Sequence, residues 1–174
     1  MYIYLVTFGN IEKRLLFGIA KNVKETFGFE VRLSSVASPL KHAYDHERKQ
    51  YVGEKILDYL STLNYPELLK ILALISWDMY AEGFNFVFGL AKIQGREAVV
   101  STFRLFSRDE RLFFERVFKE VNHELGHTFG LGHCPDRRCV MSFSNSIDDT
   151  DHKSKNFCTS CKTKLKTAIA ELTF

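Results

Sequence analysis

The densest group of metal-binding side chains lies at residues 123–134, where the sequence reads HELGHTFGLGHC. His123 and His127 are four residues apart, so on a helix they face one side and can bind the same ion. Gly130 suits a helix end at which the chain needs a positive φ, and the turn there would bring back His133 as a third ligand. Three neutral imidazoles leave one zinc position open for water, which is typical of a catalytic site.

Glu124 directly follows the first histidine and lies about 100° from it around a helix axis. At that angle its carboxylate can reach a water on the metal without being a ligand itself. Because zinc lowers the pKa of a bound water to about 7, we predict that Glu124 is the general base that takes a proton during attack on a carbonyl. Solvated or core histidines are the alternative interpretation of the motif.

Four cysteines follow as two close pairs, Cys134 with Cys139 and Cys158 with Cys161, with 18 residues between the pairs. Two pairs from two segments are the usual ligands of a tetrahedral structural zinc, which would hold the irregular segment between them together. Since Cys134 directly follows His133, this second metal would also hold the third histidine in place. A disulfide pair in a thermophile and a redox-active CxxC are the alternatives.

The combined pattern resembles a known family of enzymes. HExxHxxGxxH followed by a methionine is similar to the metzincin metallopeptidases, and Cys134, the CVM sequence at 139–141 and the CTSC sequence at 158–161 resemble the archaemetzincins. The resemblance implies a zinc-dependent metallopeptidase, either an endopeptidase or an aminopeptidase, with one catalytic and one structural zinc ion. It further implies that Met141 is the Met-turn residue, an apolar floor beneath the zinc-binding imidazoles.

The peptidase hypothesis leads to two further expectations, one for the metal ligands and one for the position of the substrate. Some metzincins have a tyrosine two residues after the methionine as an additional zinc ligand, and here Phe143 stands in that position, so we expect no such ligand. A peptide or protein substrate would lie extended beside an edge strand that includes Asn85–Gly89. The alternative function is a zinc-stabilised peptide- or protein-binding domain with little or no turnover.

Composition limits the other classes of function. The 174 residues fit one compact domain, and 45% hydrophobic with 26% charged residues is ordinary globular composition. A net charge of +3 gives no indication of a nucleic-acid partner. Neither a membrane-spanning stretch nor a signal peptide is recognisable, so we expect no membrane partner and a cytoplasmic location, in which cysteines stay reduced. The sequence does not indicate an oligomeric state.

Hydrophobic periodicity predicts an α/β fold of the metzincin type, with a twisted, mostly parallel five-stranded sheet and packed helices. A hairpin near 94–96 makes one strand antiparallel. Residues 1–130 would form a sheet-and-helix subdomain ending in the active-site helix, which Ser107 and Glu110 open as a capping box. Residues 131–174 would form an irregular, zinc-braced subdomain ending in a helix. Strands are expected at 2–8, 29–36, 68–76, 84–93 and 98–106, and further helices at 11–27, 44–63 and 161–172.

Two other groups of residues receive a structural interpretation. His42 and His46 are also four apart, but they lack a third ligand and a nearby base, so we expect an exposed helix face. A lysine-rich C-terminal region could bind an acidic partner but is more simply a solvated face; it contains Lys153, Lys155, Lys162, Lys164 and Lys166.

Overall fold

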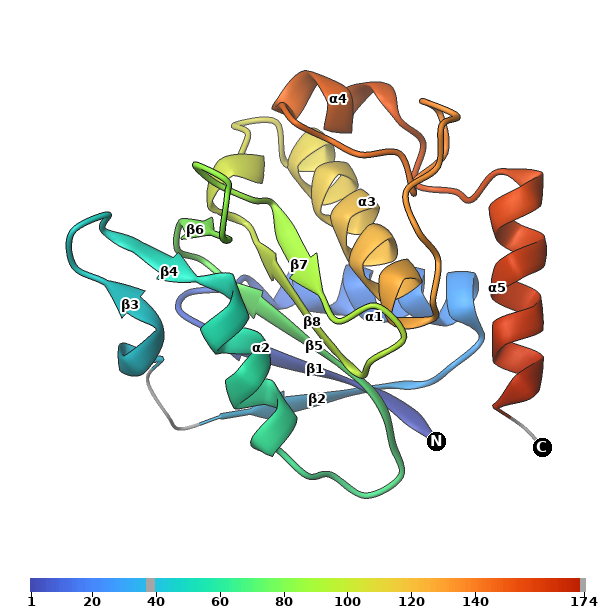
Figure 1. Cartoon of the computed structure of the whole chain (residues 1–174), viewed down its shortest axis with the longest axis horizontal. Coiled ribbons are helices and arrows are strands. Elements are labelled where there is room, and N and C mark those ends of the chain that lie inside the picture. The colour runs from blue at the N-terminus through green and yellow to red at the C-terminus, as the bar shows by residue number, and fades with distance from the viewer. Residues whose placement is uncertain (37–39, 173–174) are drawn as a thin grey trace.

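The computed structural model describes residues 1–36 and 40–172. A twisted sheet with the strand order β2-β1-β5-β8-β7 forms its centre (Figure 1). Four strands are parallel, and β7 pairs antiparallel with β8, so the predicted α/β class and mostly parallel five-stranded sheet are confirmed. The strands of this sheet are β1 (Tyr2–Phe8), β2 (Val31–Ser35), β5 (Leu68–Ile75), β7 (Gly89–Ala91) and β8 (Glu97–Ser101).

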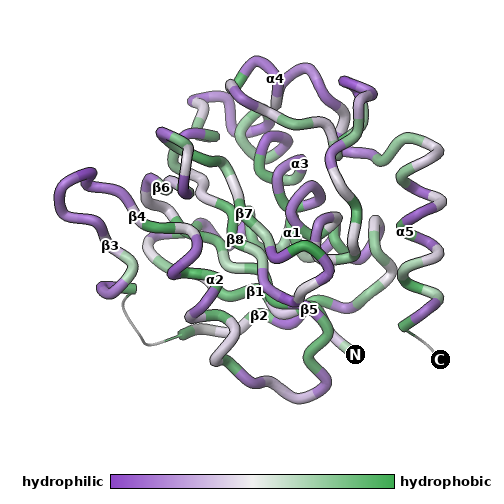
Figure 2. The backbone as a smooth tube through the Cα atoms, in the orientation of Figure 1, coloured by the Kyte–Doolittle hydropathy of each residue, from purple (hydrophilic) through white to green (hydrophobic). Residues whose placement is uncertain are grey.

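Helices cover both faces of the sheet because its central strands are apolar on both sides (Figure 2). On one face, α1 (Lys13–Phe27) and α3 (Glu110–Thr128) pack against side chains such as Leu5 and Leu72. On the other face, α2 (Gly53–Thr62) packs against the alternate side chains, such as Val6 and Ala73. Alternation along each strand therefore divides the buried residues into two cores.

The helix α3, which the sequence predicts to carry the active site, begins two residues later than a Ser107 cap would imply. Its N-cap is Asp109, whose Oδ1 accepts hydrogen bonds from the backbone N–H groups of Arg111 and Leu112 at 3.0 and 3.3 Å. Ser107 instead accepts a hydrogen bond from the N–H of Asp109 at 3.1 Å. The predicted capping box is therefore wrong, because the Asp109 carboxylate takes the helix end, where a negative charge is also favoured by the helix dipole.

The helix predicted over 44–63 is wrong in its first half. Asp45 accepts hydrogen bonds from the N–H groups of Glu47 and Arg48, and Lys49 has a φ of 55°, so the chain turns sharply there. The turn joins β3 (Tyr44–Asp45) to β4 (Gln50–Val52), and β4 pairs with β6 (Met79–Tyr80) in a second, unexpected sheet. His42 and His46 are exposed as expected, but they do not share an α-helix face: His42 lies in a short 3-10 helix (Lys41–Ala43) and His46 lies in the turn between β3 and β4.

Several other boundaries also differ. The strand expected over 84–93 is regular only in β7, and the strand expected over 98–106 ends at Ser101, after which Phe103–Leu105 forms a 3-10 turn. The segment after α3 contains a helix that was not expected, α4 (Ile147–His152), opened by a capping box of Ser146 and Asp149. The last helix is α5 (Thr159–Glu171).

Residues after Gly130 belong to the same hydrophobic core as α1 and α3. Leu131, Val140, Met141 and Leu165 are each less than 5% exposed and belong to the cluster that contains α1 and α3. The division into subdomains at residue 130 stays a prediction. No helix among the described residues is long and apolar enough to cross a membrane.

Candidate metal centres and active site

The three histidines of the motif lie together at the end of α3, with one nitrogen of each ring within 4.8 Å of those of the other two. The helix ends in a tight reversal: Gly130 has a φ of 88°, its N–H donates to the His127 carbonyl at 2.9 Å, and Leu131 N–H donates to the Gly126 carbonyl at 3.1 Å. These two bonds form a Schellman motif. The reversal brings the ring of His133 to centroid distances of 5.4 Å from His123 and 5.0 Å from His127.

Hydrogen bonds fix the state of two of the imidazole rings. His123 Nδ1 lies 2.8 Å from the Val140 carbonyl, and His127 Nδ1 lies 2.7 Å from the Leu131 carbonyl. A carbonyl only accepts, so each Nδ1 must carry the proton and each Nε2 must present a lone pair. The two Nε2 atoms are 3.0 Å apart, and two lone pairs cannot hydrogen-bond to each other. A shared cation would satisfy both, so the residues present fit a metal ion.

Burial keeps the same rings neutral. It lowers the pKa of His123 well below its usual value, and the nearby ammonium of Lys153 lowers it further. Burial also lowers the pKa of His127. It lowers the pKa of His133 as well, although this residue is more exposed. Because the neutral imidazole is the form that binds metals, this environment favours metal binding at pH values where ordinary histidines compete with protons.

Glu124 lies beside the histidines in the wall of a cavity of about 230 Å³. Its side chain is buried, and desolvation followed by the neighbouring Glu120 carboxylate raises its pKa well above the usual range, while Lys153 opposes the shift. A divalent cation bound by the histidines would favour the ionised form. The rest of the cavity wall is mostly apolar and includes Phe84, Phe86, Val87, Phe88, Leu90, Ile93 and Phe143.

Gly89, on the edge strand β7, lies against Glu124. A Cβ atom placed on Gly89 would be 2.5 Å from both Cγ and Oε1 of Glu124, closer than real Cβ contacts. A glycine is therefore needed for the edge strand to approach the helix this closely. The sequence places Gly89 in the expected edge strand but does not indicate its contact with Glu124, because the two residues are far apart in the chain.

We expect Gly89→Ala to displace the Glu124 carboxylate; if this carboxylate takes part in catalysis, as the sequence predicts, a displacement of about 1 Å should lower kcat/KM by about 10²-fold. The metal content should stay unchanged, because the three atoms nearest to a Cβ on Gly89 all belong to Glu124 and not to a histidine. Gly132→Ala is the matched control, since a Cβ at Gly132 meets no atom within 4 Å. Steady-state kinetics of both variants test whether this contact positions the Glu124 carboxylate. A wild-type kcat/KM in Gly89→Ala would contradict that role.

Met141 packs beneath the same turn of the helix. It is fully buried, and a Cβ atom placed on Gly126 would lie 2.5 Å from its sulfur. Gly126 lies between His123 and His127 in the sequence, so the methionine contacts the helix where the two histidines leave it. Met141 thus lies against the helix turn between the two histidines, and its role as an apolar floor stays a prediction. Phe143, two residues further on, packs against the His133 ring at a centroid distance of 5.1 Å.

A buried ion pair beside the cavity was not foreseen. Lys153 is 2% exposed, and its Nζ lies 3.0 Å from Glu120 Oε1 and donates to the Ser142 carbonyl at 3.2 Å. The prediction of a solvated face is thus wrong for Lys153, whereas Lys162, Lys164 and Lys166 are exposed as expected. Glu120 is four residues before Glu124 on α3, and this spacing could have indicated a second carboxylate on the same side.

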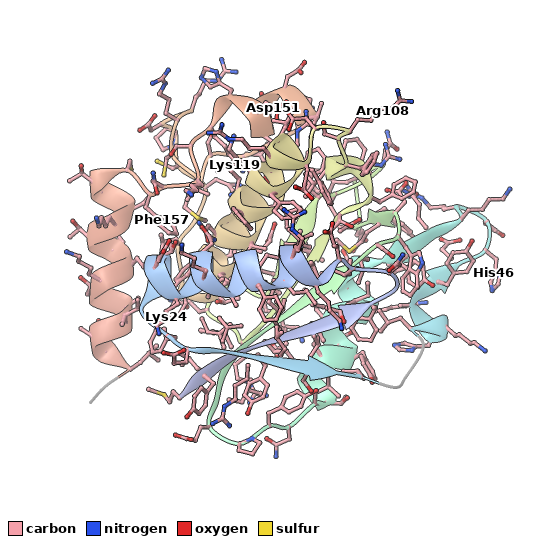
Figure 3. The ribbon with its side chains drawn as sticks, turned by 180° about the vertical axis from the view of Figure 1, so that it is seen from behind. Lys24, His46, Arg108, Lys119, Asp151 and Phe157 are labelled. Atoms are coloured by element: carbon pink, nitrogen blue, oxygen red, sulfur yellow. The ribbon has the colours of Figure 1, made fainter. Side chains whose placement is uncertain are left out.

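Short polar contacts attach α4 to α3 and so hold Lys153 in this position. Arg116 forms two hydrogen bonds of 2.6 Å with the carboxylate of Asp151. Lys119 Nζ donates to the carbonyls of Thr150 and Asp151 at 3.0 and 3.1 Å, and Figure 3 shows Lys119 and Asp151 between the two helices. These contacts explain how a segment expected to be irregular holds a buried lysine beside the histidines.

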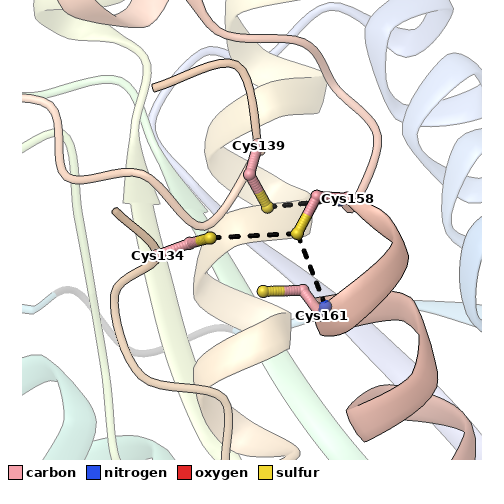
Figure 4. A group of neighbouring side chains, drawn as sticks. All are labelled: Cys134, Cys139, Cys158 and Cys161. Atoms are coloured by element: carbon pink, nitrogen blue, oxygen red, sulfur yellow. Dashed lines mark hydrogen bonds between the residues drawn. The ribbon is translucent and has the colours of Figure 1, made fainter. Parts of the chain in front are cut away.

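The four cysteines form a second cluster, next to His133. Their sulfur atoms all lie within 4.8 Å of one another, and Cys134 Sγ is 3.8 Å from Cys158 Sγ (Figure 4). All four are free thiols, so the disulfide alternative has no support in the described structure. A tetrahedron of sulfurs around zinc has edges of about 3.8 Å for Zn–S bonds of about 2.3 Å, so the donor set fits a zinc ion.

The position of Cys158 at the N-terminus of α5 favours the ionised form of its thiol. Cys158 is the N-cap of α5, and its sulfur accepts a hydrogen bond from the N–H of Cys161 at 3.5 Å. This backbone hydrogen bond is the main reason why the pKa of Cys158 is lowered. Thiolates are the form that binds zinc, so a helix N-terminus at this position favours metal binding.

Comparisons with known proteins agree with this geometry. The family model "Peptidase family M54" matches residues 13–167. An archaemetzincin of Methanopyrus kandleri is 52% identical over 142 residues, which cover 81% of this chain and 80% of that protein. An archaemetzincin of Pyrococcus horikoshii is 45% identical over 153 residues, which cover 83% of this chain and 81% of that protein.

Solved structures of archaemetzincins have the same fold. The crystal structure of the Methanopyrus kandleri protein gives a TM-score of 0.89 at 44% identity, covering 98% of this chain and 96% of that one. The Archaeoglobus fulgidus protein in complex with malonate gives 0.83 at 37% identity, covering 94% and 99%. With the family model spanning most of its length, the chain belongs to peptidase family M54, the archaemetzincin family of metallopeptidases.

Proposed function

We propose that the protein hydrolyses peptide bonds with a catalytic zinc ion held by His123, His127 and His133 and with Glu124 as the general base. One observation supports this more than any other. Two buried imidazoles direct their lone pairs at each other across 3.0 Å, in the wall of the cavity that also contains the Glu124 carboxylate. A zinc ion bound there would polarise the substrate carbonyl and lower the pKa of a water molecule.

Glu124 is proposed to move the protons of the reaction. Its carboxylate would take a proton from the attacking water and deliver it to the leaving amine, so one side chain serves as base and then as acid. Its buried position in a mostly apolar wall supports this role, because few solvent molecules compete for its proton. The Gly89 contact would hold the carboxylate in one place.

The free edge of β7 is the proposed binding site for the substrate backbone. Phe88 O accepts from Ser101 N–H, and Lys92 N–H donates to Glu97 O, so these two residues face β8. Because hydrogen-bonding directions alternate along a strand, the N–H and C=O groups of Gly89 and Ala91 face away from β8. An extended peptide can pair with them. The binding segment is thus Gly89–Ala91, later than the Asn85–Gly89 strand of the sequence prediction.

The apolar wall suggests the kind of side chain that the cavity accepts. Aromatic and branched residues dominate it, so we expect a preference for a large apolar residue next to the cleaved bond. The second carboxylate of the cavity, Glu120, is already paired with Lys153. Apart from Glu124, no unpaired acidic side chain of the described wall could bind a free amino terminus, so we propose an endopeptidase.

The four cysteines are proposed to bind a second zinc ion of structural type. Their sulfur spacing supports a closed tetrahedral site, and the direct sequence link between His133 and Cys134 would let it hold the third histidine. Residues 131–174 would then form a zinc-braced part of one compact catalytic domain.

A peptide-library experiment tests the proposal. N-terminally blocked and free peptides are incubated with zinc-loaded protein, and the products are identified by mass spectrometry with and without a hydroxamate, which binds zinc. We expect hydroxamate-sensitive cleavage of blocked peptides beside large apolar residues. Tight capture of peptides without any cleavage would contradict the proposal and favour a binding domain instead.

A further inference from the structure

Lys70 is a buried lysine that the reaction scheme does not use. It lies on β5, the middle strand of the sheet, and is 6% exposed. Its Nζ donates a hydrogen bond of 2.7 Å to the carbonyl of Thr128 and one of 2.8 Å to the carbonyl of Gly95. Thr128 is the last residue of the active-site helix α3, and Gly95 belongs to the loop between β7 and β8. The ammonium group thus joins two elements that both border the cavity.

The same loop contacts the helix end at two further points. The N–H of Gln94 donates to the carbonyl of His127 at 3.0 Å. The side chain of Gln94 packs against Gly130, where a Cβ atom would lie 3.0 Å from Gln94 Cγ. The hairpin that carries the proposed substrate-binding edge is therefore attached to the turn between the second and third histidines.

The chemistry of Lys70 suits this joint. The C-terminal end of a helix carries a partial negative charge and unsatisfied carbonyls, which a buried ammonium group can compensate. The Nζ also lies 4.7 Å from the centre of the Phe129 ring, a favourable cation–π distance. Burial lowers the pKa of Lys70 to about 8, and the charge of Glu97 opposes this shift.

A methionine or leucine at position 70 would avoid the desolvation of a charge, since the neighbouring residues on β5 are apolar. It would, however, leave the carbonyls of Thr128 and Gly95 without this donor, so the lysine also contributes to stability. The two acceptors belong to different elements, and a residue that served stability alone would not need to bridge the hairpin and the helix end.

We propose that Lys70 is a positioning residue of the active site, whose ammonium group holds the β7–β8 hairpin against the end of the helix that carries His127. This inference rests on the proposed function, because it assigns the hairpin a role in substrate binding. Gly89, at the start of β7, contacts Glu124, and Lys70 binds the carbonyl of Gly95 in the loop that follows β7. Together they would set the distance between the substrate backbone and the general base.

Lys70→Met tests the inference, since it keeps the length of the side chain and removes all donors. We expect faster amide hydrogen exchange at residues 89–97 and 127–131, with unchanged exchange in β1 and α2. For peptides long enough to pair along β7, KM should rise about tenfold or more, as expected for loss of a hydrogen bond from a charged group, while kcat changes by a smaller factor. Lys70→Arg should recover part of the lost affinity.

Lys92→Met is the matched control on the same hairpin. Lys92 forms an ion pair with Asp58 at 3.3 Å, and its side chain is 40% exposed. It faces away from the helix end, so exchange and KM should stay at wild-type values. If Lys70→Met does not fold, Lys70→Gln, which keeps two donors without the charge, takes its place.

A purely structural role would give a different result. A lower melting temperature with uniformly faster exchange and unchanged KM would overturn the inference, and so would local loosening of the hairpin without a change in KM. Failure of the proposed function is distinguishable, because wild-type protein would then cleave no peptide at all. In that case the Kd of a long peptide, measured by calorimetry, replaces KM. The inference on Lys70 is then tested by this Kd together with the amide exchange at residues 89–97.

Discussion

Replacing Glu124 by glutamine is expected to lower kcat by about 10²- to 10⁴-fold, the usual contribution of a general acid–base residue. Glutamine has nearly the same shape, so the contact with Gly89 is kept, but its amide cannot take a proton from water. Zinc content and melting temperature should change little, because Glu124 is not among the three clustered histidines that are proposed to bind the zinc. The rate is measured with the best peptide from the library, and zinc by elemental analysis.

Glu115→Gln provides the control for this variant. Glu115 lies on the same helix, but its side chain is 41% exposed and forms an ion pair of 3.8 Å with Lys155, away from the cavity. Its removal should leave kcat within a factor of about two, because exposed ion pairs contribute little. Full hydrolysis by Glu124→Gln, with no loss in kcat, would rule out the proposed base.

Local sequence spacing was sufficient to predict where the histidines and cysteines lie together. His123 and His127 are joined by one turn of helix, and the positive φ at Gly130 returns the chain toward them. The two cysteine pairs come together when the segment that follows α3 packs against the start of α5. Short-range geometry therefore decides most of this arrangement, and a motif of fixed spacing contains it.

The contacts that surround these ligands could not be predicted in the same way. Gly89 and Glu124 are 35 residues apart in sequence, and Lys70 and Thr128 are 58 apart. Lysine is almost always solvated, so composition favoured an exposed Lys153, yet an unforeseen helix α4 holds it against Glu120. Such pairs depend on tertiary structure, which no periodicity within one segment reveals.

The fold shows the same division between local and long-range information. The apolar run at 68–75 predicts β5 because a strand buried on both faces needs no alternation. The region 44–52 contains residues with high helix propensity, Glu47, Arg48 and Lys49. In the structure, however, Tyr51 N–H donates to Asp78 O at 2.8 Å, and Gln50 Nε2 donates to the Asp78 carboxylate. A partner from a distant segment thus determines the strand, and the helix starts only at Gly53.

Cys161→Ser is expected to remove one of two proposed zinc ions and to lower the free energy of unfolding by more than about 4 kcal/mol, which is typical of losing a structural metal. Cys161 is 5% exposed, so the serine hydroxyl would be buried without a metal to bind. The loss should also weaken zinc binding by the histidines, because Cys134 adjoins His133 and its N–H donates to the Met141 carbonyl at 2.9 Å. A more mobile segment around Cys134 would hold His133 less firmly in its proposed position at the zinc ion.

Ser160→Ala is the control, because Ser160 lies in the same turn of α5 but is exposed. Its zinc content and its free energy of unfolding should equal those of the wild type. Elemental analysis gives zinc per chain, thermal unfolding gives the stability, and titration with a chelator gives the affinity of the remaining site. Because the two clusters are linked through consecutive residues, the chelator should remove the histidine-bound zinc from Cys161→Ser at a lower concentration than from wild type. Unchanged zinc content and unfolding in Cys161→Ser, or disulfides in the native protein, would exclude the proposed cysteine site.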